Sequence, residues 1–221
     1  MKLQYLGDSK DSFKWDYHDY LLKEMAYPIF NIILMMTPDD KSNEGKSHPT
    51  LFPARKEIID FCYDLRSERD IRLIFELPHR TGSDYVINLH KPEMILTNNN
   101  RRIYFSGLAE KQNQILFLDP DNGFEPEHSF SEKHVLYSDI TSLLELIDNE
   151  SVISIFQHFR RVNFQKDFER IKSKLSNHYA TAIYWNFLMF VCIGKSQKTI
   201  EKVMNANIKY SKLKPKKIIV L

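Results

Sequence analysis

Short apolar runs that end abruptly in polar residues recur along the chain. Runs of this length, bounded by turn residues, predict buried strands. The predicted strands cover 29–36, 71–77, 115–118, 152–156 and 180–193, the last as one or two strands around Asn186. Weaker strand candidates are 102–105, 135–137 and 218–221, and the rest of 84–111 shows no decisive pattern.

Between these runs, apolar residues recur at helical spacing. The predicted helices cover 11–25, 54–66, 140–147, 164–175 and 197–210. The first has Phe13, Tyr17 and Leu21 on one side, which is typical of an amphipathic helix. The alternation of strands and helices predicts a single α/β domain with a Rossmann-like, largely parallel sheet and helices on both faces. Within this domain we expect an N-terminal helical segment over 1–25 and a basic tail over 212–221.

Three of the predicted strands end in polar residues. These exits are Thr-Pro-Asp-Asp at 37–40, Asp-Pro-Asp-Asn-Gly at 119–123 and Gln-His at 157–158. A proline in each of the first two removes a backbone donor and stops the sheet ladder. In open α/β sheets, ligands bind at the carboxyl ends of the strands. If the three strands are parallel neighbours, the exits converge on one edge, and we expect the functional site there.

Composition narrows the classes of function. Hydrophobic residues make up 43% and charged residues 27%, as in ordinary globular proteins, and the net charge of +2 does not by itself indicate a nucleic-acid partner. Six glycines make a glycine-rich phosphate loop unexpected. Cys62 and Cys192 lie among apolar residues, so we expect buried thiols in a reducing compartment, and no Cys/His spacing resembles a zinc site. The chain shows no signal region and no apolar run long enough for a membrane span, so we expect a cytoplasmic protein that does not enter a membrane.

Two short motifs resemble those of a known family. Residues 7–16 (GDSKDSFKWD) carry Asp and Lys ahead of the first strand, and residues 117–123 (FLDPDNG) end a central strand in Asp-Pro. The apolar last strand, 187–193, leads into a C-terminal helix. This order resembles the class I methyltransferase-like fold, and more narrowly the group with ribosomal-RNA adenine-N6 methyltransferases and three-Cys-motif partner proteins. The resemblance implies S-adenosylmethionine as cofactor and methyl transfer to a base amino group in DNA or RNA.

The resemblance also implies roles for cofactor-binding residues. Glu76, at the end of the predicted strand 71–77, matches the acidic residue that accepts from ribose hydroxyls. Asp39 and Asp40 lie where the family has a glycine-rich turn, but Gly45 is the only glycine there. Two adjacent carboxylates favour a cationic group such as an amine, a sulfonium or a metal ion.

Catalytic and substrate-binding candidates follow from the same match. Asp119 and Asn122 would hold the target amino group, with Phe124 as the aromatic partner. His158 is a candidate general base because the unperturbed pKa of histidine is about 6.5, although a hydrogen-bonded structural histidine explains it equally well. The candidates for contacts with nucleic-acid phosphates are Lys10, Lys14 and Arg160.

Two other functions remain open. Oxygen ligands suit Mg²⁺, and a metal-dependent nuclease or hydrolase of a defence or restriction type would use the carboxylates Asp39, Asp40, Asp119, Asp121 and Glu125. That hypothesis lacks a clean nuclease signature of Asp followed by Glu-x-Lys on a strand. The third possibility is a catalytically degenerate relative that binds a partner. The sequence leaves the oligomeric state open.

Overall fold

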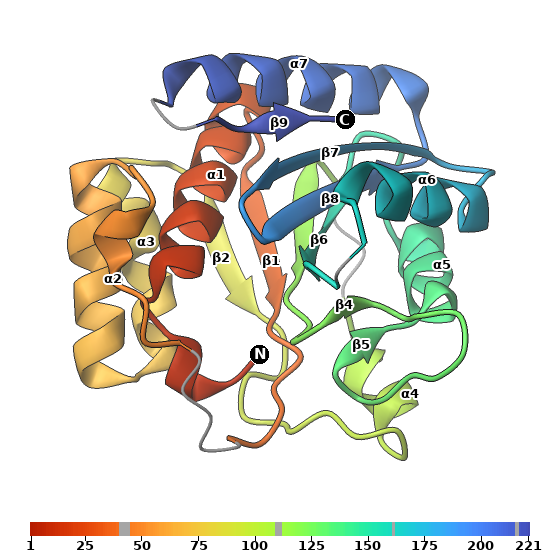
Figure 1. The fold of residues 1–221 in the computed structure, drawn as a ribbon, viewed down its shortest axis with the longest axis horizontal. Coiled ribbons are helices and arrows are strands. Elements are labelled where there is room, and N and C mark those ends of the chain that lie inside the picture. Colours follow the sequence, from red (N-terminus) through yellow and green to blue (C-terminus); the bar gives the residue numbers. More distant parts are fainter. Residues whose placement is uncertain (40–44, 109–111, 161, 215–216) are drawn as a thin grey trace.

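A seven-stranded sheet forms the centre of the computed structural model, which describes residues 1–39, 45–108, 112–160, 162–214 and 217–221 (Figure 1). The strands lie in the order β2 (Val86–Leu89), β1 (Ile29–Ile33), β3 (Gln114–Leu118), β6 (Val152–His158), β8 (Leu188–Gly194), β7 (Tyr179–Trp185) and β9 (Ile219–Val220). Strands β2, β1, β3 and β6 are parallel, whereas β8 runs antiparallel to both β6 and β7. The predicted Rossmann-like α/β fold is confirmed.

Helices cover both faces of this sheet, as predicted. The α-helices are α1 (Ser9–Met25), α2 (Lys56–Glu68), α3 (Leu77–Thr81), α4 (Arg101–Phe105), α5 (Tyr137–Leu146), α6 (Phe164–Lys174) and α7 (Gln197–Leu213). Short 3-10 helices are η1 (Leu3–Tyr5), η2 (Pro49–Leu51) and η3 (Ile71–Glu76), and β4 (Gly123–Phe124) pairs with β5 (His134–Val135) in a separate small sheet. Alternate residues of each central strand point to opposite faces. Phe117 therefore packs with α1, α2 and α7, whereas Leu116 packs with α4, α5 and α6.

Helix α1 is buried on nearly every side, which differs from the predicted amphipathic helix. Asp8 caps it, with the carboxylate accepting from two backbone amides of the first turn. Two of its carboxylates are paired inside the packing: Asp16 and Asp19 are fully buried, and both bind Arg55, at 2.7 and 2.8 Å. The predicted apolar side, with Phe13, Tyr17 and Leu21, lies in the core, and most of the polar side is buried as well.

Two predicted strands are helical in the structure. The run 71–77 forms η3 and the start of α3, because the Asp70 carboxylate caps the Arg72 amide and Pro78 occupies the first turn of α3. Residues 102–105 belong to helix α4. Conversely, β2 lies within the stretch that showed no decisive pattern. Short apolar runs do not by themselves distinguish a strand from a buried helical turn.

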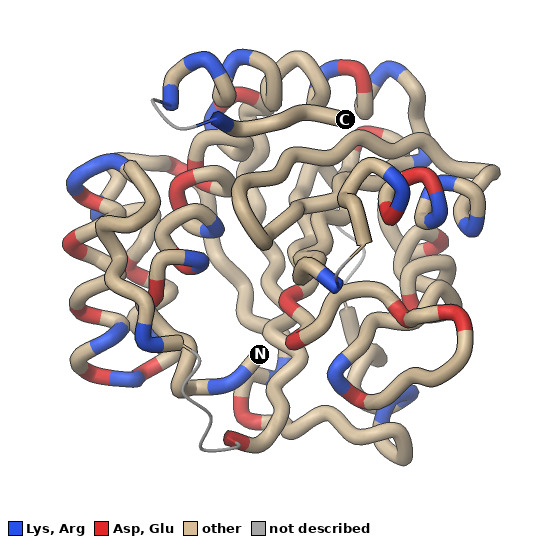
Figure 2. Tube along the Cα trace, in the orientation of Figure 1, with Lys and Arg blue, Asp and Glu red and all other residues tan. Residues whose placement is uncertain are grey.

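The C-terminal third follows the sequence prediction. Strands β7 and β8 form a hairpin around Asn186, whose φ of 51° suits a residue that tolerates the left-handed region. The predicted closing strand is β9, which pairs with β7. Figure 2 shows that Lys and Arg alternate with Asp and Glu on most outer helices, whereas α7 carries mostly Lys. Across the described ranges, none of the helices has the length and apolar character that a membrane crossing requires.

Candidate functional site

The three polar exits meet at one edge of the sheet. Strands β1, β3 and β6 are adjacent and parallel, so their carboxyl ends lie side by side, as the sequence predicted. The chain's N-terminus lies at the same edge (Figure 1). The Met1 carbonyl accepts from the Thr37 amide at 2.9 Å, and the Met1 amino group donates to the carbonyls of Met35 and Asp119. The first residue therefore lies between the ends of β1 and β3.

Lys14 is the centre of the charge cluster at this edge. Its Nζ lies 2.6 Å from Asp11 Oδ1 and 2.6 Å from Asp119 Oδ2, and all three residues are buried. Burial acts to lower the pKa of Lys14, but the two carboxylates outweigh it and the net shift is upward. Lys14 is therefore a permanent cation that neutralises two buried carboxylates.

Asp8 adds a carboxyl group that titrates near neutral pH. Its Oδ1 accepts from the amides of Lys10 and Asp11 at 2.8 and 3.0 Å, which makes it the N-cap of α1. Burial, reinforced by the nearby Asp11 charge, raises the pKa of Asp8 from 3.8 to about 6. Of the carboxyl groups around Lys14, Asp8 can therefore hold or release a proton under mildly acidic conditions.

Lys10 and His158 form the outer part of the cluster. Lys10 Nζ lies 3.1 Å from His158 Nε2, and His158 Nδ1 lies 3.0 Å from the Phe159 carbonyl oxygen. An ammonium can only donate and a carbonyl can only accept. The geometry therefore assigns a neutral His158 with its proton on Nδ1, and Nε2 accepts from Lys10.

The space that these groups enclose is small. A cavity of about 30 Å³ is bordered by α1, the end of β3 and the end of β6. Its lining includes the charged and polar residues Asp8, Lys10, Asp11, Lys14, Asp119, Asp121 and His158. A cavity of this size holds about one water molecule. The site as it stands accepts a single small polar group.

The structure thus brings together four of the predicted site residues: Lys10, Lys14, Asp119 and His158. It also places Asp8 and Asp11 with them, which the sequence suggests only as candidate N-caps of the first helix; Asp8 is that N-cap. Their signal was present in the sequence, because Asp11 and Lys14 are three residues apart and therefore adjacent on a helix.

Other predicted residues near this edge are engaged elsewhere. Phe124 is buried in β4, with its ring 5.8 Å from that of Tyr137. The backbone amide of Asn122 donates to the Lys133 carbonyl. These contacts hold the loop after β3 in place, and neither side chain lines the cavity.

Arg160 also points away from the cavity. It donates to the Phe124 carbonyl at 2.7 Å and to Asp167 at 2.9 Å. Asp167 accepts in addition from Arg170 at 2.9 Å. Arg160 therefore belongs to a separate basic group on the side of α6.

The predicted cofactor residues do not gather around Asp119. Glu76 lies on η3 and pairs with Arg80 at 2.8 Å. Asp39 is exposed and approaches the Gln4 amide at 3.5 Å, and Asp40 lies outside the described residues. Beside Asp119 the described residues leave room for about one water molecule.

Among the described residues, the carboxylates of the alternative magnesium site bind other groups of the chain. Asp119 faces Lys14, Asp121 lies 2.8 Å from the Met1 amino group, and Glu125 accepts from the Tyr137 amide. In the part of the chain that the structure describes, no group of three His, Cys, Asp or Glu residues is placed to hold a metal ion. Asp119 and Asp121 are therefore paired with cations of the chain, whereas Glu125 binds a backbone amide.

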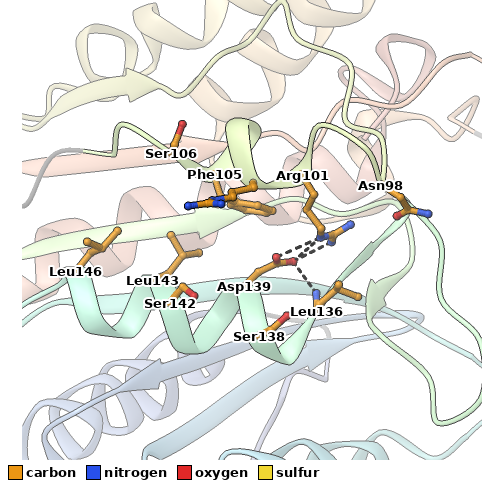
Figure 3. Close-up of a pocket in the computed structure, with 11 residues that line it drawn as sticks. Asn98, Arg101, Phe105, Ser106, Leu136, Ser138, Asp139, Ser142, Leu143 and Leu146 are labelled. Carbon is orange, nitrogen blue, oxygen red and sulfur yellow. Dashed lines mark hydrogen bonds and ion pairs between the residues drawn. The ribbon is translucent and has the colours of Figure 1, made fainter.

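A larger cavity of about 470 Å³ lies between α4 and α5 (Figure 3). Arg101 and Asp139 face each other across it at 2.9 Å, and Asp139 also accepts from the Leu136 amide. The Tyr137 amide is taken by Glu125. Carboxylates therefore bind the first amides of α5 and pair with Arg101 in this cavity.

Comparison with known proteins adds no family to this description. No protein-family model matches the sequence, and no curated protein matches it.

Proposed function

We propose that this chain is a methyltransferase-like protein that binds nucleic acid at the carboxyl edge of its sheet and is degenerate with respect to S-adenosylmethionine. The ion pairs of Lys14 with Asp11 and Asp119 carry the proposal. They connect the two motifs on which the family resemblance rests, 7–16 and 117–123. Through this buried cation, two motifs about a hundred positions apart in the chain lie together at one edge of the sheet.

The arrangement of the strands supports the methyltransferase-like part of the proposal. Strand β8 runs antiparallel between β6 and β7, and it leads directly into α7. An antiparallel strand inserted next to the last parallel strand resembles the sheet of class I methyltransferases. Fold likeness alone does not specify an activity, so the cofactor and the substrate need separate support.

The degenerate part rests on the space at the edge. A cofactor of nucleoside size needs a pocket of several hundred Å³, whereas the cavity beside Asp119 measures about 30 Å³. Glu76 and Asp39, the residues expected to hold the cofactor, lie away from this cavity. The charge cluster therefore stabilises the edge and presents Lys10 and His158 outward.

The nucleic-acid part rests on the basic group beside α6. A cavity of about 430 Å³ is lined by Arg160, Lys166 and Arg170, with Asp167 between the two arginines. Asp167 fixes both guanidinium groups in position, and some of their donors also bind the Phe124 and Glu125 carbonyls. Each guanidinium has five donors in all, and Lys166 adds a further cation to the lining. Arginine planes held in this way suit phosphate oxygens.

Binding of single strands tests the proposal directly. Fluorescence anisotropy with labelled RNA and DNA oligonucleotides should show saturable binding that weakens as salt increases. Lys166→Ala should weaken binding to every sequence and lower the salt slope by about one. Lys198→Ala is the matched control, because Lys198 is also an exposed helix lysine but lies on α7, away from the edge.

Three outcomes would overturn parts of the proposal. Failure of the wild type to bind any strand at low salt would remove the nucleic-acid partner. Saturable heat on titration with S-adenosylmethionine or S-adenosylhomocysteine in EDTA would contradict the degenerate cofactor site and favour an active methyltransferase. Cleavage of the oligonucleotide that requires Mg²⁺ would favour the nuclease instead.

A further inference from the structure

The turn between β7 and β8 holds an aromatic side chain out into solvent. Phe187 is 62% exposed, more than any other aromatic residue among the exposed hydrophobic residues of the described ranges. Its backbone is nevertheless fixed, because the Phe159 amide donates to the Phe187 carbonyl at 2.9 Å. The rings of Phe159 and Phe187 lie 5.6 Å apart. The turn therefore holds a flat apolar ring in contact with solvent.

A cavity of about 370 Å³ lies between this turn and the start of α1. Its apolar side is formed by Leu51, Trp185 and Phe187. Its polar side is formed by Lys10 together with Ser9 and Ser47, whose hydroxyl oxygens lie 2.9 Å apart. The volume falls within the range of about 300–1,000 Å³ that is usual for small-ligand sites.

Lys10 belongs both to this cavity and to the charge cluster. Lys10 lines both this cavity and the small cavity beside Asp119, and it donates to His158. A ligand on the apolar side therefore comes within reach of an ammonium group. A planar apolar ring that carries an anionic or hydrogen-bonding edge fits both sides of such a cavity.

We infer that this cavity binds one base of a single-stranded nucleic acid, with the base stacked on Phe187 and its sugar–phosphate edge toward Lys10. Stacking on an exposed aromatic ring is the general way in which proteins hold single-stranded bases. The rest of the nucleic-acid strand would continue along the neighbouring basic group. Arg160 directly follows Phe159 in the chain and lines the cavity beside α6. This inference rests on the proposed function and specifies where the base lies.

Replacing the ring tests the inference. Phe187→Ala should weaken binding of a labelled single strand about tenfold, the usual effect of losing one stacked base, whereas Phe187→Trp should retain binding. Phe75→Ala is the matched control, because Phe75 is 51% exposed on η3 and lines neither of the two cavities. An oligonucleotide of the same length without bases separates stacking from phosphate contacts: wild type and Phe187→Ala should bind it equally.

The outcomes separate this inference from the proposed function. Equal binding of the base-containing strand by wild type and Phe187→Ala would overturn the stacking site and leave nucleic-acid binding intact. A tenfold loss that persists on the strand without bases would also overturn it, because stacking is then not the cause. Absence of binding by the wild type would remove the proposed function itself.

Discussion

Asp8→Asn should make this protein more stable at neutral and alkaline pH. Asp8 is buried at the start of α1, where its carboxylate caps two backbone amides and lies near the Asp11 charge. Asparagine caps a helix about as well as aspartate. The substitution therefore keeps the cap and removes a buried negative charge.

The size of the effect follows from the pKa of Asp8. Burial and the Asp11 charge raise that pKa from 3.8 to about 6, and each unit corresponds to about 1.4 kcal/mol. Between about pH 4 and pH 6 the folded state binds a proton that the unfolded chain has lost, so wild-type stability falls as the pH rises through this window. Above this pH window, the free energy of unfolding of the asparagine variant should exceed that of the wild type by at most about 3 kcal/mol.

Urea unfolding of both proteins across this pH range measures the difference. The two free energies of unfolding should nearly coincide below about pH 4 and diverge as the pH rises. Asp8→Ala is the matched control, because it removes the same charge and also the cap. Its gain should be smaller than that of Asp8→Asn by about 1 kcal/mol.

Two results would refute this reasoning. A variant Asp8→Asn that is less stable than the wild type at pH 8 would mean that the Asp8 charge is favourable where it lies. A difference between the two proteins that does not change with pH would mean that Asp8 titrates alike in the folded and unfolded states.

Two further predictions concern α1. Lys14→Met should lower the free energy of unfolding by about 3–5 kcal/mol, because Asp11 and Asp119 would stay buried without their shared cation. Chemical unfolding measures this loss, and adding Asp119→Asn should recover part of it; full additivity of the two substitutions would contradict the ion pair. Burial lowers the pKa of His18 from 6.5 to about 3, so the unfolded chain takes up a proton that the folded state does not. This effect should lower the wild-type free energy of unfolding by up to about 5 kcal/mol as the pH falls from about 6.5 to 3. The His18→Gln variant should lack this decrease in the same unfolding series.

Strands with continuous apolar runs were the part of the fold that the sequence predicted best. Strands β1, β3 and β6 are buried on both faces, so each appears in the sequence as a mainly apolar run. The run of β1 continues past the strand to Met36, whereas β6 continues past its apolar run to His158. The run 71–77 has the same local pattern but forms η3 and the start of α3, because Asp70 caps η3 and Pro78 lies in the first turn of α3. Glu76 was placed in the cofactor site only through that wrong strand assignment.

Burial of charge could not be predicted from local pattern. Helix α1 carries Asp11, Lys14, Asp16 and Asp19, which on sequence alone look like the solvated side of an amphipathic helix. Their partners include Asp119, Arg55 and Lys214, which are far away in the chain. Only the packing of α2, η2 and α7 around α1 brings these charges together out of water.

Local sequence patterns were enough to predict the α/β class, the alternation of strands and helices, and the edge of the sheet at which polar groups collect. They were enough because apolar periodicity and turn residues act over a few neighbouring positions. Which of those polar groups share a site depends on packing between distant segments. That packing paired Lys14 with Asp119, separated Arg160 and Glu76 from them, and placed Phe187 beside Lys10. Such pairings depend on how helices and strands from distant parts of the chain pack together, and local sequence pattern carries no information about that packing.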